Sequence, residues 1–589
     1  MTDTAETLNP LWAGLLVEEL VRNGVNTFCI SPGSRSTPLT MAAAQNARAR
    51  CVVHFDERGA AYFALGYART TEKPAALICT SGTAAANYLP AVIEADRSRI
   101  PLLLLTADRP PELRETGANQ TILQAGLFGS YTRWRFDLPC PTRDIPPAFV
   151  LTTVDQAVFR ACGPDAGPVH LNCPYREPLV PGETAGGLEA SISSPWGDSN
   201  APYTAHAPVR LGLDPASANR LCVMIAEARR PVVAVGQLNR AADRAAAAAL
   251  AALLRCPVFP DVASGLRLGR PDPSVMTHFD LFLSSPEIAR ELQPDLVIQL
   301  GGPMVSKSYQ RWLGLHRPAR CVRINSHPER DDPGHLVSWR IQAALSQICE
   351  ALAGCGTADN APNKGVDAWF ERVRDCQERS ARALDRFFSA HHDLIEPAVA
   401  RYIAGAVEQS DGLFLGSSMP IRDAQRYASA CGQGPVVFAN RGASGIDGSI
   451  ATVAGAAFGS GRTLTAIVGD LAALHDLNSL ALLRTIKTPT VLVIINNNGG
   501  GIFHFLPVSS QTAVFDPYFT APHGLSFKDA AALFGLPYAK PDSMDDLKEA
   551  YTAALEQAGA TLIEITTGRA ENVALHKVID EEVFKALQA

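Results

Sequence analysis

Two short polar clusters contain the residue types that bind hard metal ions, namely Gly469-Asp470-Leu471 and Asn496-Asn497-Asn498-Gly499. An apolar run precedes each cluster, at 463–468 and at 489–495, and each run predicts a buried strand. Between them, residues 471–484 have apolar side chains at helical spacing. The order strand, helix, strand predicts two parallel strands whose carboxyl ends open at one edge of a sheet.

At that edge, Asp470 and Asn497 are expected to be neighbours although 27 positions separate them. A carboxylate, an amide oxygen and a nearby backbone carbonyl form an oxygen set suited to Mg²⁺, which takes its other ligands from water and a phosphate-bearing partner. The surrounding glycines let the backbone approach a diphosphate closely. The alternative is that both clusters are ordinary turns at strand ends.

Several other polar clusters follow predicted strands in the first third of the chain. They are the loop 31–38 with Arg35, the charged triplet Asp56-Glu57-Arg58, the small-residue turn 80–84 and the segment 107–111. The carboxyl end of a strand is where a doubly wound domain keeps its ligand site. The alternatives are a capped turn with a solvated arginine at Arg35 and solvated or capping charges at 56–58.

Alternating strand and helix patterns run through the whole chain of 589 residues and predict the α/β class. We expect three domains, at 1–185, 208–354 and 367–589, each with a doubly wound parallel sheet. Residues 181 to about 209 and 354–366 are rich in small residues and Pro, and they read as linkers.

Composition narrows the classes of partner. A formal charge of −7 and a pI near 6.0 argue against a general binder of nucleic acid or anionic membranes. No apolar run is long enough to span a membrane, and the first residues lack the pattern of a signal peptide. The 13 cysteines are scattered, and those in apolar segments (Cys29, Cys79, Cys222, Cys321) are expected to be buried free thiols. We therefore expect a cytoplasmic protein.

The Gly-Asp…Asn-Asn pattern resembles the diphosphate-binding motif of thiamine-diphosphate enzymes, although Leu471 stands where many members have Gly. Five further stretches, spread over all three predicted domains, are similar to one branch of that superfamily, the 2-succinyl-5-enolpyruvyl-6-hydroxy-3-cyclohexene-1-carboxylate synthases of the menaquinone pathway. These stretches are 31–39, 54–59, 106–113 with 117–120, 440–448 and 496–503.

The resemblance implies a role for each matching residue. It makes Glu57 the acid that hydrogen-bonds the cofactor's aminopyrimidine, and Ile446 the apolar support that keeps the cofactor bent. The implied Mg²⁺ ligands, with Mn²⁺ as the alternative metal, are Asp470, Asn497 and the carbonyl of Gly499. Further cofactor contacts are implied for Gly469, Leu471, Ser418 and Ile502. The implied substrate contacts are Arg35, Arg109, Asn119, Gln120, Lys307, Ser418, Arg422, Arg441 and Phe503, of which Arg35, Gln120 and Arg441 also assist catalysis.

The implied reaction is decarboxylation of 2-oxoglutarate and addition of the resulting succinyl unit to isochorismate. Four arginines and Lys307 would face four substrate carboxylates, and arginine binds carboxylates in a bidentate manner. For Lys307, a solvated surface position is the alternative. The family also implies a homodimer or homotetramer with active sites at subunit interfaces. Two rivals stay open: another thiamine-diphosphate-dependent decarboxylase or carboligase, and a non-catalytic relative that binds the cofactor for regulation.

Overall fold

This computed structural model describes residues 5–180, 196–269, 272–353, 364–430, 432 and 434–589, and parts of both predicted linkers (181–195 and 354–363) lie outside them. The chain forms two compact units. Unit 1 comprises Met1–Val209, Asn440–Gly461 and His475–Ile486, and unit 2 comprises Arg210–Ala439, Arg462–Leu474 and Lys487–Ala589. The strands form three sheets in which every pair between named strands is parallel. The predicted α/β fold with three parallel sheets is confirmed, whereas the exact domain boundaries stay a prediction.

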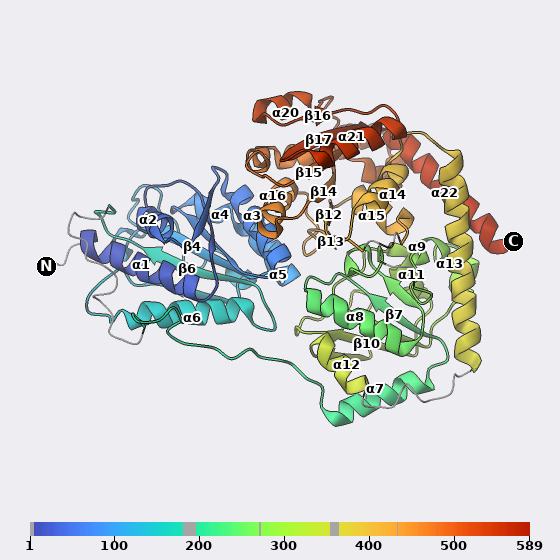
Figure 1. Ribbon diagram of the computed structural model, residues 1–589, viewed down its shortest axis with the longest axis horizontal. Helices are drawn as coiled ribbons and strands as arrows, with labels where there is room; N and C mark the ends of the chain where they lie inside the picture. Colours follow the sequence, from blue (N-terminus) through green and yellow to red (C-terminus); the bar gives the residue numbers. More distant parts are fainter. Residues whose placement is uncertain (1–4, 181–195, 270–271, 354–363, 431, 433) are drawn as a thin grey trace. The chain divides into compact units, whose positions relative to one another are not determined.

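Unit 1 contains a sheet with the strand order β2-β1-β3-β4-β6-β5. Its strands are β1 (Thr27–Ile30), β2 (Arg50–Val53), β3 (Ala75–Cys79), β4 (Leu102–Asp108), β5 (Trp134–Asp137) and β6 (Pro168–Pro174). Helices α1 (Ala5–Arg22), α2 (Thr37–Gln45) and α6 (Ala148–Cys162) lie next to this sheet (Figure 1), and their apolar side chains form one core with it. Helices α3 (Glu57–Thr71), α4 (Thr83–Ala86) and α5 (Leu89–Ser98) complete the strand–helix alternation.

Helix α16 (Ser449–Ser460) lies against α3, also within unit 1 (Figure 1). The two backbones approach so closely that a Cβ at Gly66 would lie 2.0 Å from the carbonyl oxygen of Thr452. Likewise, a Cβ at Gly455 would lie 1.9 Å from the carbonyl oxygen of Phe63. Glycine at both positions is therefore what permits this helix pair.

Unit 2 contains the other two sheets. The first has the order β11-β10-β9-β7-β8, with β7 (Pro231–Val235), β8 (Val258–Pro260), β9 (Leu296–Leu300), β10 (Arg320–Asn325) and β11 (Trp339–Gln342). One core joins it to α7 (Pro215–Glu227), α8 (Ala241–Leu254) and α12 (Leu345–Ala353), and another to α9 (Phe279–Phe282), α11 (Lys307–Leu315) and α13 (Lys364–Ala390).

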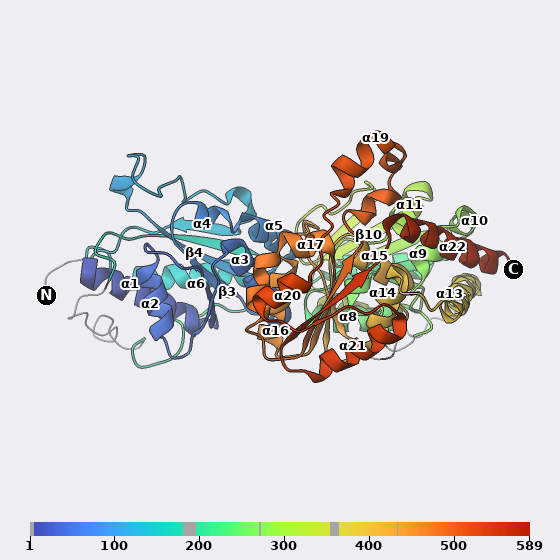
Figure 2. The same cartoon turned by 90° about the horizontal axis from the view of Figure 1, so that it is seen from above.

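The second sheet of unit 2 has the order β13-β12-β14-β15-β17-β16. Its strands are β12 (Gly412–Leu415), β13 (Val436–Phe438), β14 (Leu464–Gly469), β15 (Thr490–Asn496), β16 (Tyr538–Ala539) and β17 (Ala560–Thr566). Helices α14 (Glu396–Ala406), α15 (Met419–Tyr427) and α21 (Met544–Glu556) pack against it, and α22 (Arg569–Gln588) contacts α13 (Figures 1 and 2).

The predicted helix over 471–484 is interrupted in the structure. It consists of α17 (Asp470–His475), a 3₁₀ turn (Leu477–Ser479) and α18 (Leu480–Leu483). The buried Asp476 explains the interruption, because its carboxylate accepts hydrogen bonds from the Ser479 hydroxyl (2.7 Å) and from the backbone N–H of Ala451 (2.9 Å). Such side-chain bonds compete with helical backbone bonds.

The cysteines agree only in part with the prediction of buried free thiols. Cys29, Cys79 and Cys321 are buried and free, but Cys222 takes part in a disulfide, so the prediction is wrong there. Among the described residues, no helix is long and apolar enough to cross a membrane.

A buried acid pair in unit 1 predicts a pH-dependent stability. Glu19 accepts hydrogen bonds from Trp196 Nε1 (2.6 Å) and the Tyr203 backbone N–H (2.5 Å), and Asp155 accepts one from the Thr204 N–H (2.7 Å). Burial, with a hydrogen bond to Asp155, raises the pKa of Glu19 to about 8.

Because the folded protein holds this proton more tightly than the unfolded chain, the free energy of unfolding should fall as pH rises from about 4.5 toward 8. Glu19→Gln should flatten that decline, which urea unfolding at several pH values measures. An unchanged slope in the variant would contradict the prediction.

Candidate functional site

Strands β14 and β15 bring the two polar clusters together. The strands are parallel neighbours with Gly469 opposite Ile495, so the predicted strand arrangement is confirmed. Asp470 follows β14 directly and is 2% exposed. Its Oδ2 accepts a hydrogen bond from the backbone N–H of Gly499 at 2.8 Å, and its Oδ1 accepts one from Leu471 N–H at 2.6 Å.

The backbone after β15 folds back over Asp470 in a conformation that needs glycine. Gly499 has φ +131°, and a Cβ there would lie 2.0 Å from the carbonyl oxygen of Thr520. Asn498 has φ 61°, and its side-chain oxygen accepts hydrogen bonds from the backbone N–H groups of His523 (2.9 Å) and Gly524 (2.7 Å). Asn496 has different partners, since its Nδ2 donates to Glu564 and to the Leu525 carbonyl. The consecutive asparagines therefore have different structural roles.

Asn497 offers the most informative atom of this cluster. Its Nδ2 donates to Glu396 Oε1 at 3.0 Å, whereas its Oδ1 is buried and has no hydrogen-bond partner among the described residues. A buried polar atom without a partner costs roughly 1–3 kcal/mol, so this oxygen is suited to a bound cation.

The donor set fits a hard divalent cation that retains outside ligands. Among the described residues, no group of three His, Cys, Asp or Glu side chains could hold a metal. The edge offers instead one carboxylate (Asp470), one amide oxygen (Asn497) and the backbone of Gly499. That set leaves room for water and diphosphate oxygens, as Mg²⁺ bound to a phosphorylated cofactor requires.

Two residues at this edge were not predicted from the sequence. His523 Nε2 lies 3.2 Å from Asp470 Oδ2. Glu396, the first residue of α14, is 4% exposed and also accepts a hydrogen bond from the Thr567 hydroxyl at 2.8 Å. Burial raises the pKa of Glu396 to about 7, and the negative charges of Asp423 and Asp470 act in the same direction. Neither residue lies in a recognisable motif. At Glu396 the local sequence shows only an acid before Pro397, which is typical of any helix start.

Glu57 lies in unit 1, at the first position of α3, rather than at the end of a strand. The preceding Asp56 caps the helix by accepting hydrogen bonds from the N–H groups of Arg58 and Gly59. Glu57 is partly exposed, and its Oε2 lies 3.4 Å from the donor Asn87 Nδ2. Nearby, Val53 and Phe55 are 63% and 62% exposed.

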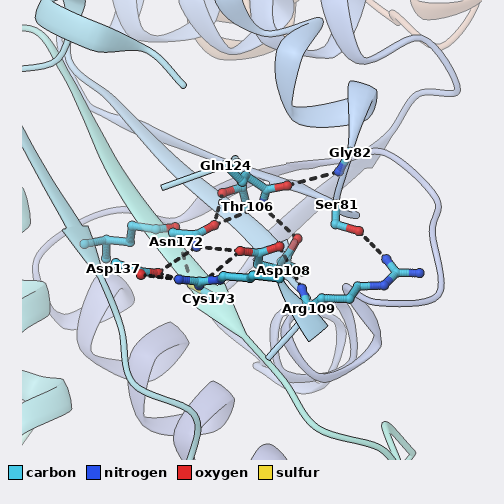
Figure 3. A network of polar contacts seen from close by, with 12 residues as sticks. Ser81, Gly82, Thr106, Asp108, Arg109, Gln124, Asp137, Asn172 and Cys173 are labelled. Carbon is cyan, nitrogen blue, oxygen red and sulfur yellow. Dashed lines mark hydrogen bonds and ion pairs between the residues drawn. The ribbon is translucent and has the colours of Figure 1, made fainter. Parts of the chain in front are cut away.

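Ser81, which follows β3, holds two predicted substrate residues, Arg109 and Gln120, and Figure 3 shows its contact with Arg109. Arg109 Nη1 donates to the Ser81 hydroxyl, whose own proton goes to the carbonyl of Gln120 at 2.9 Å. Gln120 Nε2 in turn donates to the Ser81 carbonyl at 2.9 Å. Below them, the buried Asp108 accepts from Asn172 Nδ2 at 2.9 Å and from the Arg109 N–H at 2.7 Å.

Arg35 lies near Arg109 in the same unit. It is 6% exposed, and it donates to the Tyr175 carbonyl (3.0 Å) and to Glu177 Oε1 (2.9 Å). Burial, and then the positive charge of Arg35, lower the pKa of Arg109. Two guanidinium groups that influence one another in this way favour a shared anionic ligand. Asn119, next to Gln120, is exposed.

The segment with Arg441 and Ile446 is fixed from α5. The buried Glu94 carboxylate accepts hydrogen bonds from the backbone N–H groups of Gly442 (2.9 Å) and Ala443 (2.7 Å). Arg69 and Ser98 also donate to Glu94, which satisfies this buried charge. Both Arg441 and Ile446 are partly exposed.

The remaining predicted residues lie in unit 2. Lys307 is exposed at the start of α11, and Gly469, Leu471, Ile502 and Phe503 are partly exposed. Arg422 donates through Nη1 to the carbonyl of Ser418 at the start of α15. Ser418 has φ 80° and ψ −130°, a strained conformation for a residue with a Cβ.

This strain predicts a stability gain. Ser418→Gly should raise the free energy of unfolding by about 1 kcal/mol, because glycine adopts that conformation without a Cβ penalty and the Ser418 side chain makes no capping bond to α15. Thermal unfolding measures the change, and Ser418→Ala, which keeps the Cβ, is the control. Equal melting temperatures for the two variants would contradict the strain.

Comparison with known proteins agrees with this arrangement. Residues 12–127 match the N-terminal TPP binding domain of thiamine pyrophosphate enzymes, 190–415 match their middle domain, and 421–565 match their C-terminal TPP binding domain.

Curated relatives share nearly the whole length of the chain. A 2-succinyl-5-enolpyruvyl-6-hydroxy-3-cyclohexene-1-carboxylate synthase of Rubrobacter xylanophilus is 48% identical, over 98% of this chain and 99% of its own. Proteins of the same name from Salinibacter ruber and Chlorobium phaeobacteroides are 44% and 42% identical, with 97% or more of each chain covered. The chain therefore belongs to the family of 2-succinyl-5-enolpyruvyl-6-hydroxy-3-cyclohexene-1-carboxylate synthases and is a thiamine-diphosphate-dependent transferase of menaquinone biosynthesis.

Proposed function

We propose that the protein removes CO₂ from 2-oxoglutarate and adds the remaining succinyl unit to isochorismate, with Mg²⁺ and thiamine diphosphate bound at the edge of β14 and β15. The observation that supports the metal site is the buried Oδ1 of Asn497, which has no hydrogen-bond partner among the described residues, in the turn whose Gly499 N–H binds the Asp470 carboxylate. The names of the relatives support the reaction.

Asp470, Asn497 and the carbonyl of Gly499 would hold the metal, and the glycine-rich turn after β15 would accommodate the diphosphate. Gly469, Leu471, Ser418 and Ile502 would contact the cofactor, Ile446 would support its bent form, and Glu57 would hydrogen-bond the aminopyrimidine. When bound, thiamine diphosphate supplies the electron sink that makes loss of CO₂ from a 2-oxo acid feasible.

The substrates carry four carboxylates, and the basic residues of the chain are suited to them. We assign Arg35 and Arg109 to carboxylate binding because they influence one another electrostatically and because Ser81 fixes the Arg109 fork. Asn119, Gln120, Lys307, Ser418, Arg422, Arg441 and Phe503 complete the proposed substrate contacts, with Arg35, Gln120 and Arg441 also assisting the reaction. Arg35 Nη2 donates to Glu177 Oε1 at 2.9 Å, so a substrate carboxylate would compete with Glu177 for this guanidinium group.

Product analysis tests the proposed reaction. The purified protein, incubated with 2-oxoglutarate, isochorismate, thiamine diphosphate and Mg²⁺, should form a product whose mass equals both substrates less CO₂. Replacing 2-oxoglutarate by pyruvate should give little product, because pyruvate lacks the second carboxylate. Equal decarboxylation of both acids would favour the rival decarboxylase, and absence of any turnover would favour a non-catalytic relative.

We further propose a cytoplasmic homodimer or homotetramer with its active sites at subunit interfaces. The exposed Val53 and Phe55 beside Glu57 support an interface there, because apolar side chains with more than half their surface exposed favour burial against a partner. Phe55→Asp should shift the molecular mass measured by light scattering toward the monomer. The same substitution at Tyr518, which is 80% exposed in unit 2, is the control. An unchanged oligomer in Phe55→Asp would refute this interface.

A further inference from the structure

Glu396 is a buried acid that no step of the proposed reaction uses. It begins α14, 101 positions before Asn497, and its Oε1 accepts two hydrogen bonds, from Asn497 Nδ2 at 3.0 Å and from the Thr567 hydroxyl at 2.8 Å. Desolvating a carboxyl group this completely is costly unless its hydrogen bonds are satisfied. Any two hydrogen-bond donors would satisfy the buried carboxyl group, so stability alone does not explain why one of them is the amide of Asn497.

The amide of Asn497 has two chemically different ends, and only one of them binds a cation. Its oxygen is an acceptor and its NH₂ group is a donor. If the NH₂ group faced the metal, the ligand would be lost and a donor would point at a positive charge. Something in the protein must therefore choose between the two orientations of the side chain.

Glu396 is the residue placed to make this choice. A carboxylate oxygen only accepts hydrogen bonds, so only the NH₂ end of Asn497 suits the position beside Oε1. The consequence is visible at the opposite end of the amide, where Asn497 Oδ1 is buried and lacks a partner among the described residues.

We propose that Glu396 is a positioning residue that orients the Asn497 amide so that Oδ1 is presented to the metal. The inference rests on the proposed function, since it requires a metal at Asp470 and Asn497. It resembles the way in which second-layer carboxylates fix the orientation of metal-binding side chains in other proteins.

Binding of Mn²⁺ in the presence of thiamine diphosphate, followed by electron paramagnetic resonance on the full-length protein, measures this role independently of turnover. Glu396→Ala should weaken Mn²⁺ binding by about 10- to 100-fold. Glu396→Gln, whose side-chain oxygen still accepts from Asn497, should stay within about threefold of the unchanged protein. Thr567→Val is the matched control, because it removes the other hydrogen bond to the same oxygen and leaves the amide contact in place.

A paired substitution tests the orientation itself and remains decisive if Glu396→Ala does not fold. Asn497→Asp places a carboxylate against Glu396, so Mn²⁺ binding should weaken. Adding Glu396→Gln supplies an NH₂ donor to the new carboxylate. The double variant should therefore bind Mn²⁺ at least tenfold more tightly than Asn497→Asp alone. No restoration in the double variant would overturn the proposal.

The metal site and the role of Glu396 can be tested separately. If Asp470→Ala weakens Mn²⁺ binding and Glu396→Ala does not, the proposed metal site stands and the role of Glu396 is wrong. If Asp470→Ala leaves Mn²⁺ binding unchanged, the proposed metal site is itself wrong, and the role of Glu396 falls with it.

Discussion

Glu57→Gln should reduce turnover by about two to four orders of magnitude while leaving thiamine diphosphate affinity within a few-fold. Removing a group that shifts a proton in the reaction typically costs this much, whereas glutamine keeps the size and much of the hydrogen bonding of glutamate. Steady-state kinetics with 2-oxoglutarate and isochorismate gives the turnover, and calorimetric titration gives the affinity.

The neighbouring acid provides the control for this experiment. Asp56→Asn keeps a side chain that caps α3 well, so it should retain nearly full turnover and a similar melting temperature. If Glu57→Gln turned over as fast as the unchanged protein, Glu57 would have no part in proton transfer. If both variants lost activity alike, the helix start rather than the acid would be responsible.

Asp470→Ala should weaken Mg²⁺-dependent binding of thiamine diphosphate by at least tenfold, because it removes the carboxylate of the proposed metal site. It also removes the acceptor for the Gly499 N–H, so the turn after β15 loses one of its anchors. Calorimetric titration of thiamine diphosphate with Mg²⁺ and with a chelator separates these effects, since only the metal contribution disappears in the chelator.

A surface aspartate of the same unit is the matched control. Asp529→Ala, on α20 (Lys528–Phe534), removes an exposed carboxylate and should bind the cofactor as the unchanged protein does. Equal Mg²⁺-dependent affinity in Asp470→Ala and Asp529→Ala would exclude Asp470 from the metal site.

Sequence patterns predicted the parts of this fold that local physics determines. Strands β14 and β15 are apolar runs bounded by turn residues, and their observed bounds differ by one residue from the predicted 463–468 and 489–495. The edge strand β5 was missed because half its residues are exposed and its apolar signal is weak. The interruption at Asp476 was missed because its cause is a bond to Ala451, which is distant in the sequence.

The same distinction applies to the site. Asp470 and Asn497 were recognisable because strand ends of one supersecondary unit meet at a predictable edge. Glu396 and His523 come to that edge from other parts of unit 2, and no pattern in their local sequence predicts these contacts. Likewise, Glu57 lies at the start of a helix rather than at the end of a strand because Asp56 caps that helix.

Gly66 and Gly455 limit how far helices α3 and α16 can move independently of each other. Helix α3 begins with Glu57, and α16 begins three residues after Ile446. Because the two backbones touch without intervening side chains, α3 and α16 should move as one rigid pair. If Glu57 and Ile446 contact the coenzyme as proposed, a motion of this pair would displace both contacts together.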